Sequence, residues 1–415
     1  MKLWEKGKKL NKLIEDFTVG DDYIIDREFI SYDCAASIAH AKTLEKAGFL
    51  TPNESTKIIK ELENIKKNGI EIKKEDEDLH TAIENRLVKR LGNTGKKIHA
   101  GRSRNDQIMA AIQLWGRDKI RTVHDLAVNL CTTFNKFSKA NPLIMPGYTH
   151  MQKAMPSSLQ LLLGSYIESL FDDLLLLKTS FIINNSNPLG SAAGYGTSLN
   201  LDRNFTAKLL GFKENKNYIY AQNRPKLIST LLLPLCSIMK TLDKIASDLL
   251  VFTANEFDFF SLPSAFCTGS SIMPQKKNYD VLELMRGKSA IVHSSLYTVD
   301  MLDCKLISGY NRDFQLAKKP LIEAFNTTID CLKIMDLVYK NLKVNKSGVE
   351  KAVTPELFAA DSAYEFVKKG DAFRDAYKKT AKNLKLIKIP DDIYKDRIFL
   401  KFKDYKTEID KIKKL

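Results

Sequence analysis

Four long stretches of helical periodicity constrain the fold of this chain more than any other feature. Apolar residues recur in them every three or four positions, as on a helix with a wide buried face. The stretches cover about residues 105–140, 157–184, 226–256 and 281–302. At a rise of 1.5 Å per residue the last three predict rods of roughly 35–45 Å, and the first predicts a longer one. The sequence therefore predicts an all-α fold around a bundle of long helices.

Some of these helices are apolar on more than one face, since residues 174–177 are four consecutive leucines. Helices of this kind are buried on all sides, either inside one chain or between chains. One helical domain of this size cannot cover so much apolar surface, so the pattern favours association of identical chains. Pro234 lies inside one of the stretches and is expected to kink its helix.

Breaks in the pattern divide the chain into three predicted domains. A small helical domain covers residues 1–103, the long-helix domain 104–345, and a small Lys-rich domain 346–415. In the first domain, a capping box at Thr51–Glu54 opens a helix to about Lys67, and an earlier helix over 32–47 ends at Gly48. Polar and Gly-containing turns, where a helical enzyme places its site, occupy residues 99–107, 145–156, 187–203 and 262–280.

Composition excludes several classes of protein. The net charge of +15 comes from 65 Lys+Arg and 50 Asp+Glu, and residues 366–415 alone supply +8 of it. The basic residues elsewhere are spread among acidic ones without interleaved aromatics, so we expect no nucleic-acid binding. The longest uncharged apolar stretches, 154–167 and 227–239, are too short for a bilayer span, so no membrane association is expected. The six cysteines are widely spaced and the N-terminus holds no apolar signal core, which favours a cytoplasmic protein with reduced thiols.

The most informative segment is residues 268–278, TGSSIMPQKKN. Gly269 permits positive φ, Pro274 stiffens the loop, and Ser270 lies among backbone N–H groups and Lys276. These are the groups needed to bind carboxylates and to stabilise a developing anion. The segment closely resembles the GSSxMPxKxN signature of the aspartase/fumarase superfamily, whose members eliminate fumarate from succinyl compounds.

Other segments resemble one branch of that superfamily, the argininosuccinate lyases and their lens relative delta-crystallin. They are DEDLHT at 76–81, HAGRSRNDQ at 99–107, PGYTHMQKAMP at 146–156 and GYNRDFQ at 309–315. The resemblance implies a three-domain fold and cleavage of argininosuccinate to arginine and fumarate without a metal or other cofactor. It also implies a homotetramer in which each active site is shared by three chains.

The same resemblance implies the catalytic residues. Ser270 matches the base that removes a Cβ proton, and Lys276 matches a cation that stabilises its alkoxide and a substrate carboxylate. His150 matches the acid/base histidine, and Glu283 matches the carboxylate paired with it.

The expected substrate ligands come from several segments. Arg104, Asn105 and Thr149 match binders of the fumarate half, where an arginine fork can grip a carboxylate, and Asn278 matches a further carboxylate ligand. Tyr310, Gln315 and Lys318 match binders of the arginine half. Supporting contacts are expected from Ser103, Asp76 and His80.

Three departures from the family pattern and three alternatives accompany this interpretation. Family members often carry a substrate-binding serine in an Asn-x-Ser context near the start, where this chain has residues 17–22, FTVGDD, whose Gly20 backbone or carboxylates could replace that contact. Tyr279 replaces the proline that usually follows the signature asparagine, and the match fades beyond about Thr380, which implies a reduced third domain. The alternatives are another superfamily lyase such as adenylosuccinate lyase or aspartase, a catalytically silent crystallin-like protein, and a basic nucleic-acid binder.

Overall fold

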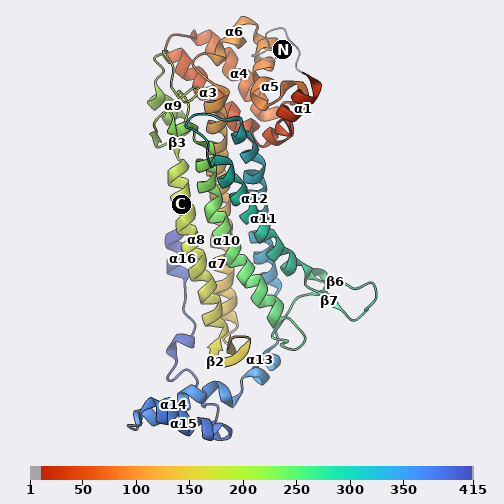
Figure 1. Cartoon of the computed structure of the whole chain (residues 1–415), viewed down its shortest axis with the longest axis vertical. Coiled ribbons are helices and arrows are strands. Elements are labelled where there is room, and N and C mark those ends of the chain that lie inside the picture. Colours follow the sequence, from red (N-terminus) through yellow and green to blue (C-terminus); the bar gives the residue numbers. More distant parts are fainter. Residues whose placement is uncertain (1–10, 414–415) are drawn as a thin grey trace. The chain divides into compact units, whose positions relative to one another are not determined.

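The computed structural model describes residues 11–413, and α-helices dominate them (Figure 1). By contacts the chain forms two compact units. Unit 1 comprises the chain up to Thr122 together with Leu176–Leu235 and Val292–Asn326, and unit 2 comprises Val123–Leu175, Cys236–Ile291 and the chain from Thr327. The divisions fall inside long helices, and each unit is described by itself. The three predicted domains, with boundaries at 103 and 345, stay a prediction.

Five long helices contribute to the two units. They are α7 (Arg104–Ala140), α8 (Leu159–Asn184), α10 (Arg224–Phe252), α11 (Asp280–Asp303) and α12 (Lys318–Asn341). The first four confirm the predicted stretches, and α7, with 37 residues, extends over about 55 Å. Helix α12 was not among the predicted stretches. Helix α10 continues through Pro234 as one element.

Helix α10 also has the length and composition of a candidate membrane span. Two thirds of its most apolar window (67%) is buried inside the protein, and buried core helices share this length and apolar composition.

The remaining helices of unit 1 are short. They are α1 (Lys12–Val19), α2 (Asp22–Ile25), α3 (Ile30–Lys46), α4 (Pro52–Asn68), α5 (Leu79–Leu91), α6 (Asn93–Lys96) and α9 (Arg203–Leu210). The capping box at Thr51 and Glu54 is present and opens α4, which confirms the prediction. Helix α3 packs against α4 and α9, and Gly48, at φ 81°, ends the turn that follows it.

Unit 2 holds short helices and most of the strands. The helices are α13 (Lys346–Ala352), α14 (Ala359–Lys368), α15 (Phe373–Lys382) and α16 (Lys406–Ile412). The strands are β1 (Ile144–Thr149), β2 (Gln152–Ser158), β5 (Phe260–Ser261), β6 (Thr268–Gly269), β7 (Lys277–Asn278) and β8 (Lys343–Val344), which pair antiparallel as β1–β2, β5–β8 and β6–β7. The sequence predicted only turns at 145–156, whereas the structure forms a hairpin there.

Two short strands and several single turns complete the elements. Strands β3 (Ser186–Asn187) and β4 (Glu214–Asn215) pair in parallel in unit 1. The 3-10 turns are η1 (Asp26–Phe29), η2 (Lys74–Asp76), η3 (Lys97–His99), η4 (Tyr220–Gln222), η5 (Ser264–Phe266), η6 (Arg312–Ala317), η7 (Pro355–Phe358), η8 (Leu384–Leu386) and η9 (Ile398–Leu400).

Aromatic residues mark the core of each unit. In unit 1, Trp115 of α7 is fully buried and meets Phe29 and Phe325 edge to face, which joins α7 to α12. In unit 2, Phe134 of α7 contacts Tyr166 of α8 and Tyr339 of α12. The long helices therefore pack on one another in both cores, as the predicted bundle requires.

Candidate active site

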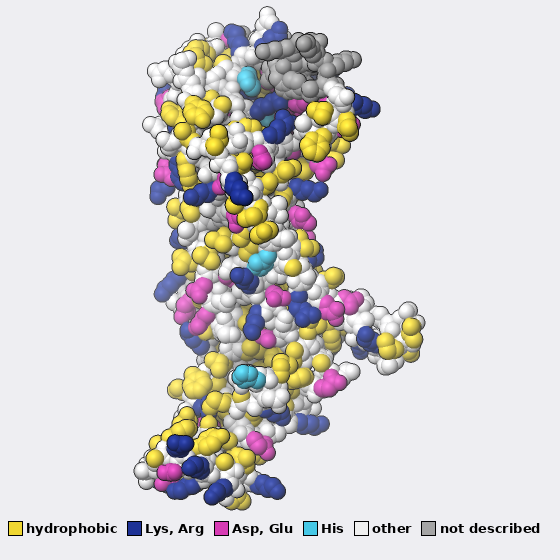
Figure 2. Space-filling model, in the orientation of Figure 1, with side chains coloured by type: hydrophobic (Ala, Val, Ile, Leu, Met, Phe, Trp, Pro, Cys, Tyr) yellow, Lys and Arg dark blue, Asp and Glu magenta, His cyan; other side chains and the backbone are white. Residues whose placement is uncertain are grey.

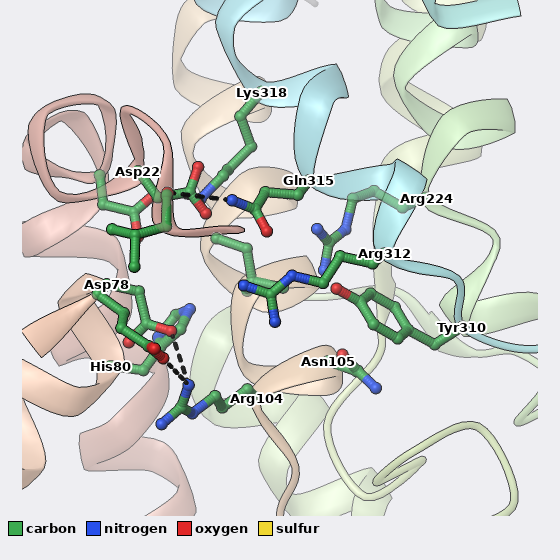
Figure 3. Close-up of a pocket in the computed structure, with 14 residues that line it drawn as sticks. Asp22, Asp78, His80, Arg104, Asn105, Arg224, Tyr310, Arg312, Gln315 and Lys318 are labelled. Atoms are coloured by element: carbon green, nitrogen blue, oxygen red, sulfur yellow. Dashed lines mark hydrogen bonds and ion pairs between the residues drawn. The ribbon is translucent and has the colours of Figure 1, made fainter. Parts of the chain in front are cut away.

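A cavity of about 170 Å³ lies in unit 1, where the N-terminal ends of α7 and α10 meet η6, the start of α12 and the first short helices (Figure 3). Six predicted site residues line it: His80, Arg104, Asn105, Tyr310, Gln315 and Lys318. Other residues that line it were not predicted from the sequence: Val19, Asp22, Asp26, Glu77, Asp78, Ile108, Arg224 and Arg312. The structure thus brings together side chains from segments that are almost 300 residues apart in the sequence.

Lys318 is the most strongly held cation of the cavity. It is 3% exposed, and its Nζ lies 2.8 Å from a carboxylate oxygen of Asp22 and 2.6 Å from one of Asp26. Burial acts to lower the pKa of Lys318, but the two carboxylates outweigh burial and raise that pKa above its ordinary value. Burial also raises the pKa of the Asp22 carboxyl. Lys318 is therefore a buried member of a charged cluster, although most lysines in proteins are solvated.

Arg104 occupies the first position of α7, where Ser103 fixes the helix end. The Ser103 hydroxyl accepts the N–H of Asn105, and the Ser103 N–H donates to the Asp106 carboxylate, so both side chains cap the start of α7. One guanidinium nitrogen of Arg104 lies 3.2 Å from Asp78 and 3.5 Å from Glu77. Its Nη2 is buried and has no hydrogen-bond partner.

A buried ion pair supports the cavity wall behind His80. The His80 Nδ1 lies 2.6 Å from an oxygen of Asp33, which is fully buried and also receives the side-chain amide of Gln107. Burial acts to lower the pKa of His80, yet Asp33 and Asp78 outweigh it and raise the pKa. Burial acts to raise the pKa of Asp33, and His80 outweighs it and lowers the pKa. Both shifts favour an imidazolium paired with a carboxylate.

The chain segment that departs from the family pattern contributes to the same cavity. The Gln315 amide donates to the carbonyls of Thr18 and Val19, and Arg312 donates to the carbonyl of Thr18. These bonds hold the end of α1 beside η6. Asp22 therefore lines the cavity near the position where family members often carry a serine.

Two predicted unit 1 residues do not line the cavity. Ser103 caps α7, as described above. Asp76 accepts hydrogen bonds from the Asn85 amide and the Lys73 backbone N–H, so its contacts fix the turn before α5. Their roles toward substrate stay predictions.

The missed residues had weak signals in the sequence. Asp78 and Arg312 lie inside the DEDLHT and GYNRDFQ segments, where more than one polar residue could face a ligand. Arg224 lies just before the predicted stretch 226–256, and nothing in the sequence singled it out. The structure makes it the first residue of α10 and places it on the cavity wall.

In unit 2, the predicted histidine lies on a strained turn. Thr149 and Gln152 are paired across the β1–β2 hairpin, so His150 and Met151 form a two-residue turn. Both have positive φ, 52° and 60°, which turns of this kind require but which residues other than glycine rarely adopt. Strain of this kind clusters at functional sites. The His150 side chain is exposed.

Ser270 lies in the loop between β6 and β7, which projects from the rest of unit 2 (Figure 1). Its Oγ accepts the backbone N–H groups of Ile272 and Met273 at 3.2 and 3.1 Å. The side chain of Ile272 is 86% exposed, and Lys276 is exposed on the same loop. The loop thus presents a serine oxygen to solvent while two N–H donors point at it.

The other predicted residues of unit 2 lie near these two elements in sequence. The Asn278 amide donates to the Gly269 carbonyl at 3.5 Å across the β6–β7 pair, and Glu283 is exposed in the first turn of α11. Within the described part of a single chain, no hydrogen bond or ion pair joins Glu283 to His150. None of the predicted unit 2 residues lines the unit 1 cavity. Within one chain the predicted site residues therefore fall into separate groups. Within residues 11–413, no group of three metal-binding side chains occurs.

Comparison with known proteins identifies the family of this chain. A family model described as "Lyase" matches residues 6–293. An argininosuccinate lyase of Thermotoga neapolitana is 45% identical over 387 residues, covering 92% of this chain and 97% of that protein. One from Bacteroides fragilis is 41% identical, covering 91% of this chain and 86% of that protein. The chain therefore belongs to this lyase family and, within it, to the argininosuccinate lyases.

Solved structures agree on the fold. An EDDS lyase in complex with formate superimposes with a TM-score of 0.77 at 24% identity, covering 91% of this chain and 76% of that chain. A class II fumarase from Schistosoma mansoni gives a TM-score of 0.75 at 17% identity, covering 89% and 87%. The predicted all-α, fumarase/aspartase-like fold is thereby confirmed.

Proposed function

We propose that this chain is an argininosuccinate lyase that reversibly eliminates fumarate from argininosuccinate and releases L-arginine. The reaction needs a base at Cβ of the succinyl part and a charged environment for the carbanion that follows. The observation that carries the proposal is the pair of N–H donors on the Ser270 Oγ, in a loop with the family signature. The chain's identity to argininosuccinate lyases supports the substrate.

Ser270 acts as the base in this proposal. A serine hydroxyl is a poor base near neutral pH, so the alkoxide must be favoured by its surroundings. The N–H groups of Ile272 and Met273 stabilise the charged form because they already point at the oxygen and need no reorganisation. The cation of Lys276 adds to this when the loop closes on substrate.

The departing nitrogen of the arginine half needs a proton. His150 supplies it directly or through water, and Glu283 raises the basicity of that imidazole once the two are brought together. Thr149 and Asn278 bind the succinyl carboxylates beside them. These assignments rest on the family resemblance and on the exposure of His150, Glu283 and Thr149, with Asn278 half-buried.

The unit 1 cavity binds the non-reacting parts of the substrate. Arg104 offers an unpartnered Nη2 to a carboxylate of the fumarate half, with Asn105 next to it. Tyr310, Gln315 and Lys318 line the region assigned to the arginine half. Binding energy from that half orients the succinyl group toward the base.

We further propose a cytoplasmic homotetramer in which three chains contribute to each active site. Long helices carry exposed apolar side chains, which are visible as yellow surface in Figure 2; they include Leu175, Ile182, Leu233, Leu284 and Tyr297. Burial of this surface between copies would bring the exposed turn of His150 and the loop of Ser270 to cavities of other chains.

The test is an absorbance assay of fumarate release from argininosuccinate. Fumarate and arginine should form in equal amounts, without added metal and in the presence of a chelator. Loss of activity on chelation, or turnover of adenylosuccinate but not argininosuccinate, would refute the proposal.

The shared site has its own test. His150→Asn and Ser270→Ala proteins, each inactive, should regain part of the activity when they are unfolded together and reassembled, because some mixed tetramers contain intact sites. Hybrid tetramers without activity, or a fully active monomer, would exclude the shared site.

A further inference from the structure

Arg224 is a buried cation of the cavity that lacks an acidic partner. It is the first residue of α10 and is 4% exposed. Its Nε is buried without a hydrogen-bond partner, and its Nη1 makes a long bond of 3.4 Å to the carbonyl of Phe314. Among the described residues, no carboxylate lies within ion-pair distance of its guanidinium, although two hold Lys318 nearby.

The surroundings of Arg224 favour a ligand in that position. Its guanidinium lies over the ring of Tyr310, 5.6 Å from the ring centroid, and Figure 3 shows it beside Arg312 on the wall of the cavity. Burial lowers the pKa of Arg224, which nearby Tyr310, Asp22 and Asp26 only partly offset. A buried charge that keeps unmade hydrogen bonds is costly, and the cost is recovered when a counter-ion binds.

We propose that Arg224 binds the α-carboxylate of the arginine half of the substrate and thereby selects amino-acid substrates over their decarboxylated or amidated analogues. The inference rests on the proposed function and names one subsite of it. Two guanidinium groups of the cavity, those of Arg104 and Arg224, each have a buried nitrogen without a partner. They enter from different helices, α7 and α10, and we assign them to two separate carboxylates. Arg104 takes the succinyl end, and Arg224 takes the end where Tyr310 and Gln315 lie.

The alternative is that Arg224 has only a structural function, holding η6 through the Phe314 carbonyl. A long bond to one carbonyl does not use the planar fork of an arginine. By contrast, Arg117 in the same unit donates to the carbonyls of Leu210 and Gly211 and to the Asn185 amide oxygen at 2.8–3.0 Å. The Nε of Arg117 is buried without a partner as well. Arg224 differs from Arg117 because its Nη atoms make one long bond among the described residues, whereas those of Arg117 make three short ones.

The test uses products and analogues as inhibitors of fumarate release. In the wild-type protein, argininamide, which keeps the ammonium and the guanidinium but lacks the carboxylate, should inhibit at least about 30-fold more weakly than arginine. In Arg224→Gln the inhibition constant of arginine should rise by about 30-fold or more and approach that of argininamide. Arg224→Lys, which keeps the charge and loses the fork, should lie between them.

Two measurements distinguish loss of this subsite from a folding defect. The inhibition constant of fumarate, which binds at the Arg104 end, should stay within about threefold in Arg224→Gln, whereas a collapsed cavity would weaken both products. The control Lys319→Gln changes an adjacent exposed cation that pairs with Asp21 and should leave both constants unchanged. Equal inhibition of the wild type by arginine and argininamide, or an unchanged arginine constant in Arg224→Gln, would overturn the inference.

A calorimetric titration separates this outcome from failure of the proposed function. If the wild type releases no fumarate, the proposed function fails, and the heats of arginine and argininamide binding still decide the Arg224 subsite. Preference for arginine that is lost in Arg224→Gln would support the subsite, and absence of the preference would refute it.

Discussion

The cavity of unit 1 and the Ser270 loop of unit 2 are built in opposite ways. In the cavity, Lys318 is 3% exposed and bonded to two carboxylates, and His80 is tied to fully buried Asp33. In the loop, Ile272 is 86% exposed, and Ser270 is held only by N–H groups of its own turn. One region is fixed by long-range contacts, whereas the other is defined locally.

This contrast separates two tasks of an elimination enzyme. Recognition of a charged substrate requires fixed charges in a dry environment, and such charges are costly unless they are paired with one another or with the ligand. A base that attacks Cβ must approach the substrate after binding, so a loop with few outside contacts is suited to it. Changes in the cavity should therefore affect affinity and stability, and changes in the loop should affect turnover.

The largest expected effect comes from Ser270→Ala. Loss of the base should lower kcat by about 10²–10⁴-fold, while calorimetric affinity for arginine stays unchanged because the cavity is intact. Ser271→Ala is the matched control, since no N–H of the described loop donates to its hydroxyl. If Ser270→Ala keeps a tenth or more of the wild-type kcat, Ser270 is not the base and the division of tasks is wrong.

The second effect is on stability, in the cavity. Lys318→Met leaves Asp22 and Asp26 buried without their cation, which should cost about 3–5 kcal/mol in the free energy of unfolding. Urea denaturation measures it, with Lys319→Met as the exposed control. The variant should also raise KM for argininosuccinate. A loss below about 1 kcal/mol would mean that the three charges do not form a tightly coupled group.

Arg104→Gln should have an intermediate effect on binding. The substitution removes the guanidinium nitrogen that we assign to a substrate carboxylate. A hydrogen bond to a charged group contributes about 1.5–3 kcal/mol, so KM should rise about 10- to 100-fold. The control is Arg121→Gln, which changes an exposed arginine on the same helix. A fall in kcat with unchanged KM would contradict the assignment of Arg104 to recognition.

The smallest expected effect is a change of stability with pH. The folded-state pKa of His80 is raised above 6.5, so its pair with Asp33 contributes fully below pH 6.5 and weakens as pH rises through the folded-state value. Because the pKa of Asp33 is lowered in the folded state, acidification weakens the pair only below about pH 3.8. The unfolding free energy of the wild type relative to His80→Gln should thus be larger at pH 5.5 than at pH 9. A difference that grows with pH would show that His80 is neutral in the fold.

Local elements followed from the sequence because their causes are local. The capping box at Thr51 needs only residues three positions apart, and the four long helices needed only a periodic apolar pattern. The β1–β2 hairpin was missed because its turn uses His150 and Met151 instead of the Asn-Gly or Asp-Gly pairs that signal such turns. Helix α12 was not singled out, although its residues are as buried as those of the other long helices.

By itself the sequence determined the helical class, the family and the segments that carry the chemistry, since each depends on residues close together in the chain. Only the tertiary structure decided which side chains meet. The pairing of Lys318 with Asp22 and Asp26 joins residues nearly 300 positions apart, and the unpaired state of Arg224 depends on everything packed around it. The burial of a side chain and the compensation of its charge depend on all the residues packed around it, and no local sequence pattern encodes them. For this reason a lysine that composition would place in solvent is buried, and an arginine that looked ordinary becomes a candidate ligand.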